Sequence, residues 1–180
     1  WPRVKERLLD EIPHIGMGDI CDFKNFMGAV IDKKAFDSIS EYIQLAKTDP
    51  IYEILCGGNC DASMGYFIEP TIVRSLEPKS RLMTEEIFGP VLTVFVYPDE
   101  EYEAALDLCD KTSPYGLTGS IFALDRSAIV KAMTVLRQAA GNFYVNDKPT
   151  GAIVGQQPFG GSRASGTNDK AGSWLNLERW

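Results

Sequence analysis

Apolar residues recur at helical spacing in two stretches of the first half of the chain. The first stretch carries four of them: Trp1, Val4, Leu8 and Ile12. Pro2 suits the first turn of this helix, where backbone N–H groups have no partner within the helix. The second helix is expected to begin at Asp32, whose carboxylate can accept hydrogen bonds from such N–H groups, and to end before Pro50. Its apolar face consists of four residues: Phe36, Ile39, Ile43 and Ala46.

Short apolar runs between and after these helices predict strands. Residues 29–31 are expected to form a short strand, and residues 51–56 a second one that stops at two glycines. Residues 66–73 are extended, with Pro70 implying an edge or a bend. Residues 91–97 give the strongest strand signal because they are nearly all apolar and carry no charge. Such a run is typical of a strand buried on both faces, as in a parallel sheet.

The second half continues the alternation of helix and strand. A helix is predicted from residues 98–101, where acidic side chains lie at the positive end of the helix dipole. Its inner face is expected to carry Tyr102, Ala105, Leu106 and Cys109. Residues 117–124 form the next strand, Asp125 caps a third helix that Gly141 ends, and residues 143–145 form another strand. The third helix is expected to turn five residues inward: Ile129, Ala132, Met133, Leu136 and Ala140. This order predicts an α/β fold with right-handed crossovers.

Length, composition and charge restrict the class of protein. The chain has 180 residues, of which 44% are hydrophobic and 24% charged, values typical of one globular domain or one lobe of a larger enzyme. The net charge of −7 without a basic stripe makes nucleic acid an unexpected partner. No apolar run reaches the ~18 residues of a membrane helix, and no signal peptide is visible. Because the chain begins with Trp1, we expect the natural N-terminus to lie upstream.

Four cysteines give no metal site. Cys56 and Cys60 are close in sequence, but a tetrahedral site needs four ligands and no second close pair exists. The single histidine, His14, is distant in sequence, so no metal ligands are predicted. Cys56 is expected at the end of a buried strand and Cys109 on the inner face of a helix, as ordinary thiols.

Two segments carry the most specific signal. The first, residues 83–90, reads M-T-E-E-I-F-G-P; the second, residues 141–166, includes P-F-G-G-S-R-A-S-G within a glycine-rich stretch. Together they resemble the C-terminal half of the aldehyde dehydrogenase catalytic domain, although Arg163 stands where most members have lysine. The resemblance covers nearly the whole chain. It implies a partial three-layer, parallel-sheet α/β catalytic domain over residues 1–180, without the nucleotide-binding domain and the nucleophile segment.

Four shorter strings are similar to one branch of this superfamily, the L-glutamate γ-semialdehyde (1-pyrroline-5-carboxylate) dehydrogenases. They occupy residues 142–148, 150–152, 154–159 and 166–170. The resemblance implies oxidation of L-glutamate γ-semialdehyde to glutamate with NAD, in proline catabolism. In this family a cysteine thiolate attacks the aldehyde, hydride passes to the nicotinamide, and a thioester is hydrolysed. It also implies a homo-oligomer, cytoplasmic in bacteria and in the mitochondrial matrix in eukaryotes, with no nucleic-acid or membrane partner.

The resemblance assigns cofactor residues to the first segment. Glu86 corresponds to the glutamate that accepts hydroxyl hydrogen bonds from the nicotinamide ribose, and Glu85 is its solvated neighbour. Phe88 corresponds to the phenylalanine that packs beside the nicotinamide ring. A phenylalanine buried in the core is the alternative interpretation of Phe88.

The second segment supplies expected substrate contacts. Phe159 resembles the aromatic wall of the aldehyde pocket. The loop that binds the substrate carboxylate through backbone N–H groups corresponds to Thr150, Gly151 and Ala152. For these residues a plain turn is the alternative.

No catalytic residue is assigned to this chain, because none of its cysteines lies in the sequence context of the family's nucleophile. The 180-residue chain is therefore expected to be an inactive fragment of the enzyme. Two other functions stay open at this point. One is a non-catalytic α/β interaction module, and the other is a dehydrogenase for another aldehyde, such as succinate semialdehyde.

Overall fold

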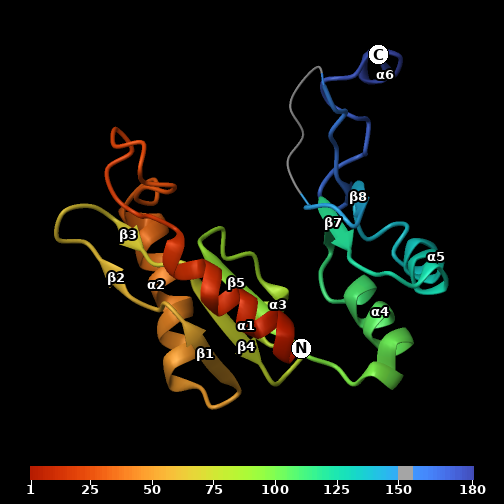
Figure 1. Ribbon diagram of the computed structural model, residues 1–180. Helices are drawn as coiled ribbons and strands as arrows, with labels where there is room; N and C mark the ends of the chain where they lie inside the picture. The colour runs from red at the N-terminus through yellow and green to blue at the C-terminus, as the bar shows by residue number, and fades with distance from the viewer. Residues whose placement is uncertain (150–155) are drawn as a thin grey trace. The chain divides into compact units, whose positions relative to one another are not determined.

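The computed structural model describes residues 1–149 and 156–180, in two compact units (Figure 1). Unit 1 comprises Trp1–Val96 and unit 2 comprises Tyr97–Trp180. Helices and strands alternate in both units, which confirms the α/β class. The predicted carboxylate-binding residues lie outside the described part of the chain: Thr150, Gly151 and Ala152.

Unit 1 is built on a three-stranded mixed sheet with the order β1–β4–β5. Strand β1 (Tyr52–Cys56) is antiparallel to β4 (Thr71–Ser75), and β4 is parallel to β5 (Val91–Phe95). A second, antiparallel pair joins β2 (Cys60–Asp61) to β3 (Phe67–Ile68). The prediction of a parallel sheet therefore holds in this unit for β4 and β5 alone. The reason is the connection: no helix separates β1 from β4, and a parallel neighbour requires a longer crossover.

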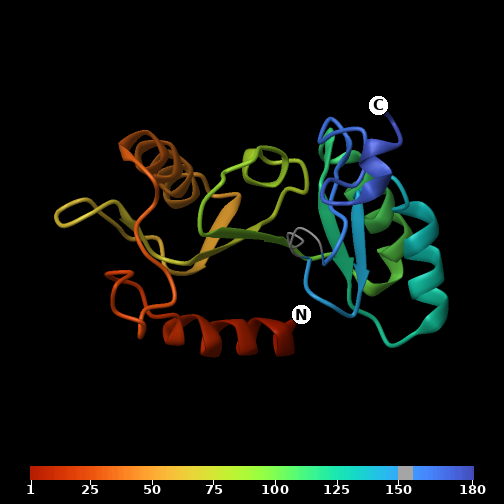
Figure 2. The ribbon, with the colours of Figure 1, turned by 90° about the horizontal axis from the view of Figure 1, so that it is seen from above.

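One helix lies on each face of this sheet (Figures 1 and 2). Helix α1 (Pro2–Glu11) continues into a short 3₁₀ turn, η1 (Ile12–His14), and α2 (Lys33–Thr48) lies on the opposite face. The buried core of the unit includes Ile39, Ile43, Ala46, Tyr52, Ile68, Val73 and Leu82. Helix α1 buries no side chain and reaches the sheet through an ion pair, with 3.8 Å between Lys5 Nζ and Glu53 Oε1.

The start of α2 confirms one prediction and corrects another. Asp32 caps the helix, since its Oδ1 accepts a hydrogen bond of 2.8 Å from the backbone N–H of Ala35. The strand predicted at residues 29–31 does not form. Only Val30 donates a backbone hydrogen bond to a neighbouring segment, 2.9 Å to the carbonyl of Tyr66, and Ile31 is exposed. One backbone hydrogen bond is not enough to form the repeated pairing of a β-strand.

Strand β5 is not buried on both of its faces. Val91 packs against the core beneath α2, whereas Leu92, on the other face of the sheet, is 49% exposed. The apolar run at residues 91–97 correctly predicted the strand, and its expected burial at Leu92 was wrong.

Unit 2 centres on a parallel pair of strands, β7 (Thr118–Ile121) and β8 (Asn142–Val145). One face of the pair is covered by α4 (Tyr102–Lys111), which follows a 3₁₀ turn, η2 (Asp99–Glu101), and by α5 (Arg126–Val135) (Figure 2). The buried core consists of Leu106, Ala132 and Leu136. Helix α5 is the crossover that allows β7 and β8 to run in parallel.

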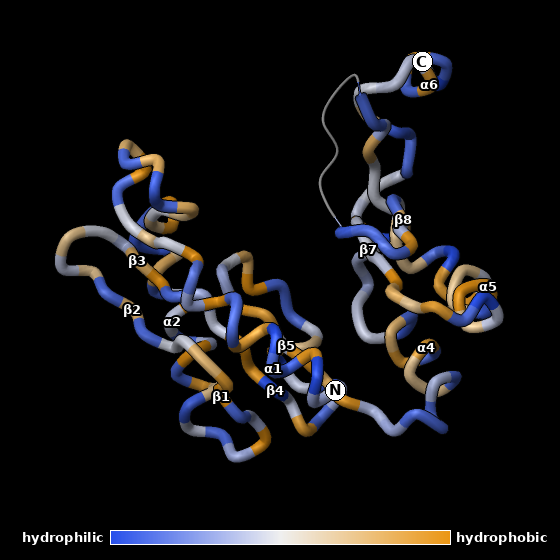
Figure 3. The backbone as a smooth tube through the Cα atoms, viewed as in Figure 1, coloured by the Kyte–Doolittle hydropathy of each residue, from blue (hydrophilic) through white to orange (hydrophobic). Residues whose placement is uncertain are grey.

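Helix α5 begins where the sequence predicts. It ends earlier than predicted, and fewer of its residues face the interior than the five that were expected. Asp125 accepts a hydrogen bond of 2.8 Å from Ser127 N, which confirms the cap. Met133, predicted to face inward, is 49% exposed. Apolar residues cover much of the circumference of α5 (Figure 3), so their spacing alone does not single out the buried stripe. On α4, Cys109 lines the same depression as Tyr102 and Leu106, as predicted, but it is exposed.

Gly141 does not end α5, whose last residue is Val135. It is required instead by a close crossing of two segments. A Cβ on Gly141 would lie 1.8 Å from the carbonyl oxygen of Gly160, a distance that no side chain can occupy.

The described residues of the glycine-rich stretch carry little regular structure. Strand β6 (Tyr115–Gly116) pairs with β9 (Ser162–Arg163), and a short helix, α6 (Trp174–Leu177), lies near the last residue. Among the described residues, no helix has the length and apolar character needed to cross a membrane.

Candidate functional site

The clearest candidate site is the loop of residues 85–90, which joins α3 (Arg81–Thr84) to β5. Its side chains differ in burial. Ile87 packs against the core of unit 1, whereas its neighbours Glu86 and Phe88 are exposed. The two residues predicted to contact the cofactor are therefore both exposed on one short loop.

Phe88 has an unusual conformation. Its φ is +53°, and its side chain is 89% exposed. Left-handed φ values are costly for a bulky residue, and exposing an aromatic ring gains nothing for folding. The structure thus contradicts the interpretation of Phe88 as a core residue. It presents a flat apolar ring at the surface at a conformational cost.

The depth of the loop is fixed by Gly89. A Cβ on this residue would lie 2.6 Å from Cδ1 of Ile39, a buried residue of α2. The backbone can approach α2 this closely only because glycine has no side chain. Together, Gly89 and Ile87 hold the middle of the loop against the core.

The start of the loop is held by Glu85. Its Oε2 accepts a hydrogen bond of 2.7 Å from the hydroxyl of Tyr42, on α2. Arg81 donates from Nε to both carboxylate oxygens, at 3.1 and 3.2 Å, and from Nη2 to Oε2 at 2.9 Å. Hydrogen bonding to Arg81, with a further bond from Tyr42, holds the pKa of the Glu85 carboxyl below its usual value. Glu85 was predicted as a solvated neighbour of Glu86. Its side chain is 42% exposed, as expected, and it also forms the contacts to Arg81 and Tyr42 that the sequence did not indicate.

A cavity of about 290 Å³ lies beside this loop. It is lined by residues of α3, the loop and β5: Leu82, Met83, Glu85, Glu86, Ile87, Phe88, Gly89, Val91 and Thr93. Within the described part of the chain, the Glu86 carboxylate makes no hydrogen bond or ion pair. The buried Thr93 Oγ1 also lacks a partner among those residues. A free carboxylate and a flat ring fit a ligand that combines a ribose with an aromatic ring.

In unit 2 the described candidate is Phe159, which is half-buried and donates a backbone hydrogen bond of 3.2 Å to Ala171 O. The neighbouring Lys170 is directed into the backbone: its Nζ donates to Gly141 O at 2.6 Å and to Asn142 Oδ1 at 3.2 Å. Burial lowers the pKa of the Lys170 amine. Asn142 also donates to Pro158 O at 3.0 Å. The segment around Phe159 is thus tied to the start of β8.

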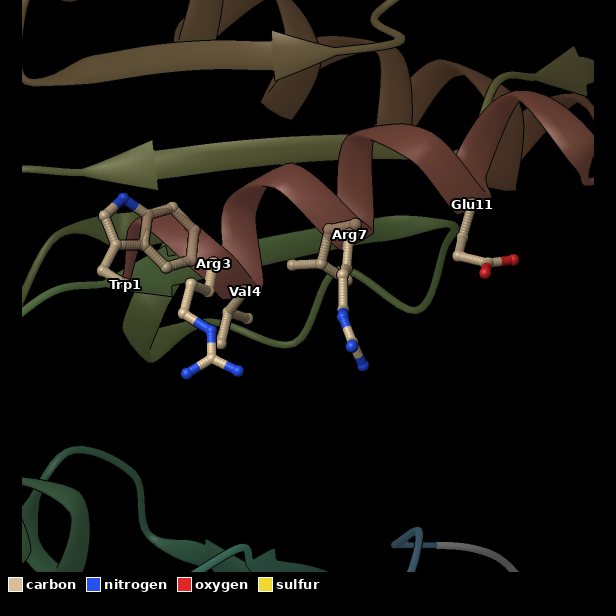
Figure 4. Close-up of a pocket in the computed structure, with 6 residues that line it drawn as sticks. Trp1, Arg3, Val4, Arg7 and Glu11 are labelled. Atoms are coloured by element: carbon tan, nitrogen blue, oxygen red, sulfur yellow. The ribbon is translucent and has the colours of Figure 1, made fainter.

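A surface depression of about 510 Å³, larger than the cavity beside the loop, runs along α1 (Figure 4). Its wall is a single helix face: Trp1, Arg3, Val4, Arg7, Leu8 and Glu11. Figure 4 shows the guanidinium groups of Arg3 and Arg7 directed away from the helix. Because one helix face encloses little, this depression is a weaker candidate than the loop of residues 85–90. Across residues 1–149 and 156–180, no group of three or more His, Cys, Asp or Glu side chains is arranged to hold a metal ion.

Comparison with known proteins places the chain in a family. Residues 1–178 match the profile of the Aldehyde dehydrogenase family, and the chain belongs to it. Among its relatives, the mitochondrial delta-1-pyrroline-5-carboxylate dehydrogenase of Dictyostelium discoideum is 58% identical over 180 residues, and that of Homo sapiens is 55% identical over 181 residues. Both alignments cover 100% of this chain and 32% of the relative. The chain therefore spans about a third of the length of these curated relatives.

A solved structure agrees with these relatives. The delta-pyrroline-5-carboxylate dehydrogenase from Mycobacterium tuberculosis bound with NAD superimposes with a TM-score of 0.88 at 51% identity. The match covers 100% of this chain and 32% of that chain. The family and the branch that the motifs indicated are thereby confirmed as the relatives of this chain.

Sequence reasoning missed the part of the site that supports Glu86 and Phe88. The spacing of Arg81 and Glu85, four residues apart around a short helix, is a signal that could have been used. The contribution of Tyr42 had no such signal, since 43 residues separate it from Glu85. The free hydroxyl of Thr93 could not be foreseen either, because its isolation depends on which partners the fold brings near.

Proposed function

We propose that this chain is the C-terminal portion of the catalytic domain of an NAD-dependent dehydrogenase that oxidises L-glutamate γ-semialdehyde to glutamate. The identity of 50–58% to several pyrroline-5-carboxylate dehydrogenases over nearly the whole chain supports this activity. The parallel pairs β4–β5 and β7–β8 support its membership of a three-layer, parallel-sheet domain. The same proposal gives the enzyme a role in proline catabolism, a homo-oligomeric state and, in a eukaryote, a location in the mitochondrial matrix.

The observation that carries the proposal is the outward pair Glu86 and Phe88 on a loop that is held on both sides. NAD, when bound, accepts the hydride that leaves the substrate. Glu86 would accept hydrogen bonds from hydroxyl groups of the nicotinamide ribose, for which its carboxylate is free. Phe88 would lie against the nicotinamide and limit its movement, which its exposed ring and fixed backbone allow.

The substrate side is proposed from the sequence segment that precedes Gly160. Backbone N–H groups of the glycine turn at Thr150, Gly151 and Ala152 would bind the α-carboxylate of the substrate. Phe159 would form an apolar wall beside the aldehyde chain. No cysteine lines the cavity beside the loop of residues 85–90, and we assign the nucleophile to a segment outside this chain.

The test is a comparison of aldehydes with the full-length protein that carries this chain. We expect NADH formation with glutamate semialdehyde at a kcat/KM at least about tenfold above that with succinate semialdehyde or propanal. A preference for succinate semialdehyde would support the other dehydrogenase. Absence of turnover with every aldehyde, in a folded protein, would support the non-catalytic interaction module instead.

A further inference from the structure

We propose that Glu85 is a positioning residue of the cofactor site, which sets the direction of Glu86 and Phe88 by fixing the start of their loop to α2 and α3. The inference rests on the proposed function, because it requires that these two residues bind NAD. Glu85 itself points toward Tyr42 and Arg81, so its role is exerted through the residues that follow it.

The backbone at Glu85 is where the chain leaves α3. Its N–H donates a hydrogen bond of 2.9 Å to the carbonyl of Arg81, the last contact of the helical turn. Its ψ of 145° then turns the chain into the extended loop. The orientation of Glu86 therefore depends directly on how Glu85 is held.

The side chain of Glu85 holds this point from two directions. Arg81 binds both carboxylate oxygens from within α3, and the Tyr42 hydroxyl binds Oε2 from α2. The Arg81 guanidinium also lies 5.2 Å from the centre of the Tyr42 ring, so the three side chains form one closed cluster. A long helix of 16 residues thus fixes a loop that is 43 residues away in sequence.

The loop is held by two kinds of contact. Ile87 and Gly89 are held by apolar packing, which fixes how deep the loop lies. Glu85 is exposed and is held by polar contacts to Arg81 and Tyr42, and hydrogen bonds fix direction as well as depth. The left-handed conformation of Phe88 persists only where the surroundings determine it on both sides. The Glu85 cluster provides this on the N-terminal side.

If Glu85 served only to stabilise the fold, its loss would lower the melting temperature and leave the use of NAD unchanged. Exposed ion pairs contribute little to the stability of a protein, and Arg81 and Glu85 are 61% and 42% exposed. Loss of the Glu85 charge should therefore leave the melting temperature almost unchanged. If the residue positions the loop, the same change should still alter the use of NAD.

The experiment measures steady-state kinetics of Glu85→Gln in the full-length protein. We expect the KM for NAD to rise about 5- to 10-fold, because small displacements of binding groups are costly. The KM for the aldehyde should stay within about twofold, since the altered loop holds the cofactor. Tyr42→Phe, which removes one hydroxyl and keeps the ring, should shift the KM for NAD in the same direction by a smaller factor. The matched control is Asp37→Asn, which breaks the exposed ion pair of Lys33 and Asp37, also four residues apart, and should change neither KM.

A double variant tests whether Glu85 acts through Glu86. When Glu86→Gln is already present, adding Glu85→Gln should raise the KM for NAD by a smaller factor than in the single variant, because only the effect through Phe88 remains. Full additivity, or an unchanged KM for NAD in the single Glu85→Gln variant, would overturn the inference while leaving the proposed function intact. If Glu86→Gln itself leaves NAD kinetics unchanged, the proposed cofactor site is wrong and the role of Glu85 is refuted with it.

Discussion

At the scale of single residues, Glu86 combines an exposed carboxylate with the absence of a partner in the described part of the chain. We predict that Glu86→Gln lowers kcat/KM for NAD in the full-length protein by about 10- to 100-fold, because an amide offers one acceptor oxygen where the carboxylate offers two charged ones. The melting temperature should not change, since the residue supports nothing else. Unchanged kinetics with NAD would remove Glu86 from the cofactor site.

A substitution at Phe88 should affect NAD binding and protein stability in different directions. Asparagine tolerates left-handed φ values better than phenylalanine, and the ring of Phe88 is 89% exposed. We therefore predict that Phe88→Asn keeps or raises the melting temperature and at the same time raises the KM for NAD about tenfold. Thermal unfolding and NAD titration of the same preparation provide the measurement. A lower melting temperature with normal NAD kinetics would show that the ring serves folding alone.

The proposed role of Thr150, Gly151 and Ala152 in substrate binding can be tested through Gly151. We predict that Gly151→Val sharply lowers kcat/KM for glutamate semialdehyde, because a branched side chain restricts the backbone that would bind the α-carboxylate. Propanal has no carboxylate, so its oxidation should be affected much less. The two substrates are compared at saturating NAD. Equal losses for both, with NAD affinity intact, would mean that the turn only supports the structure.

The site residues differ in how far the sequence reveals them. Glu86 and Phe88 follow from a contiguous motif, because their arrangement depends on a few neighbouring residues. The contacts of Glu85 include a hydrogen bond from Tyr42, which is visible only in the folded structure, where α2 lies beside the loop. Local sequence therefore predicts the groups proposed to face the ligand, and the fold adds the groups proposed to orient them.

At the scale of helices and strands, the cap of α2 is the best-supported local signal. We predict that Asp32→Ala destabilises the chain by about 1 kcal/mol, since Ala35 N loses its acceptor. Urea unfolding followed by circular dichroism gives this value. Asp37→Ala, which removes a carboxylate from the same helix without uncapping it, should have a much smaller effect. Equal effects of the two changes would show that charge, not capping, stabilises α2.

The elements missed by the sequence share a physical cause. Residues 29–31 are apolar like a strand but find no continuous ladder, so pairing, not composition, decides the outcome. On α5, Met133 is as apolar as its buried neighbours, and only contact with α4 and the strands selects Ala132 and Leu136 for the interior. In contrast, α2 was predicted correctly because its long periodic run leaves few alternatives. The continuous apolar run at residues 91–97 predicted the existence of β5, but not the exposure of Leu92.

At the scale of the whole molecule, the chain holds proposed cofactor and substrate residues and spans about a third of its relatives. We predict that the purified 180-residue chain forms no NADH from glutamate semialdehyde, since no cysteine lines the cavity at Glu86. The measurement is NADH formation at high protein concentration, with the full-length protein as the positive control. Any NAD-dependent turnover above that of a boiled sample would refute this prediction.

The crossing at Gly141 and Gly160 has a consequence for any attempt to transplant the proposed substrate-binding segment. Two backbones meet there with room for no methyl group, and Lys170 and Asn142 link the same two segments. A replacement segment that begins at residue 146 would therefore separate the two backbones that fit each other at this crossing. A graft from a relative with another aldehyde preference must carry the stretch from residue 141 to residue 171 as one block, because each half is shaped to the other.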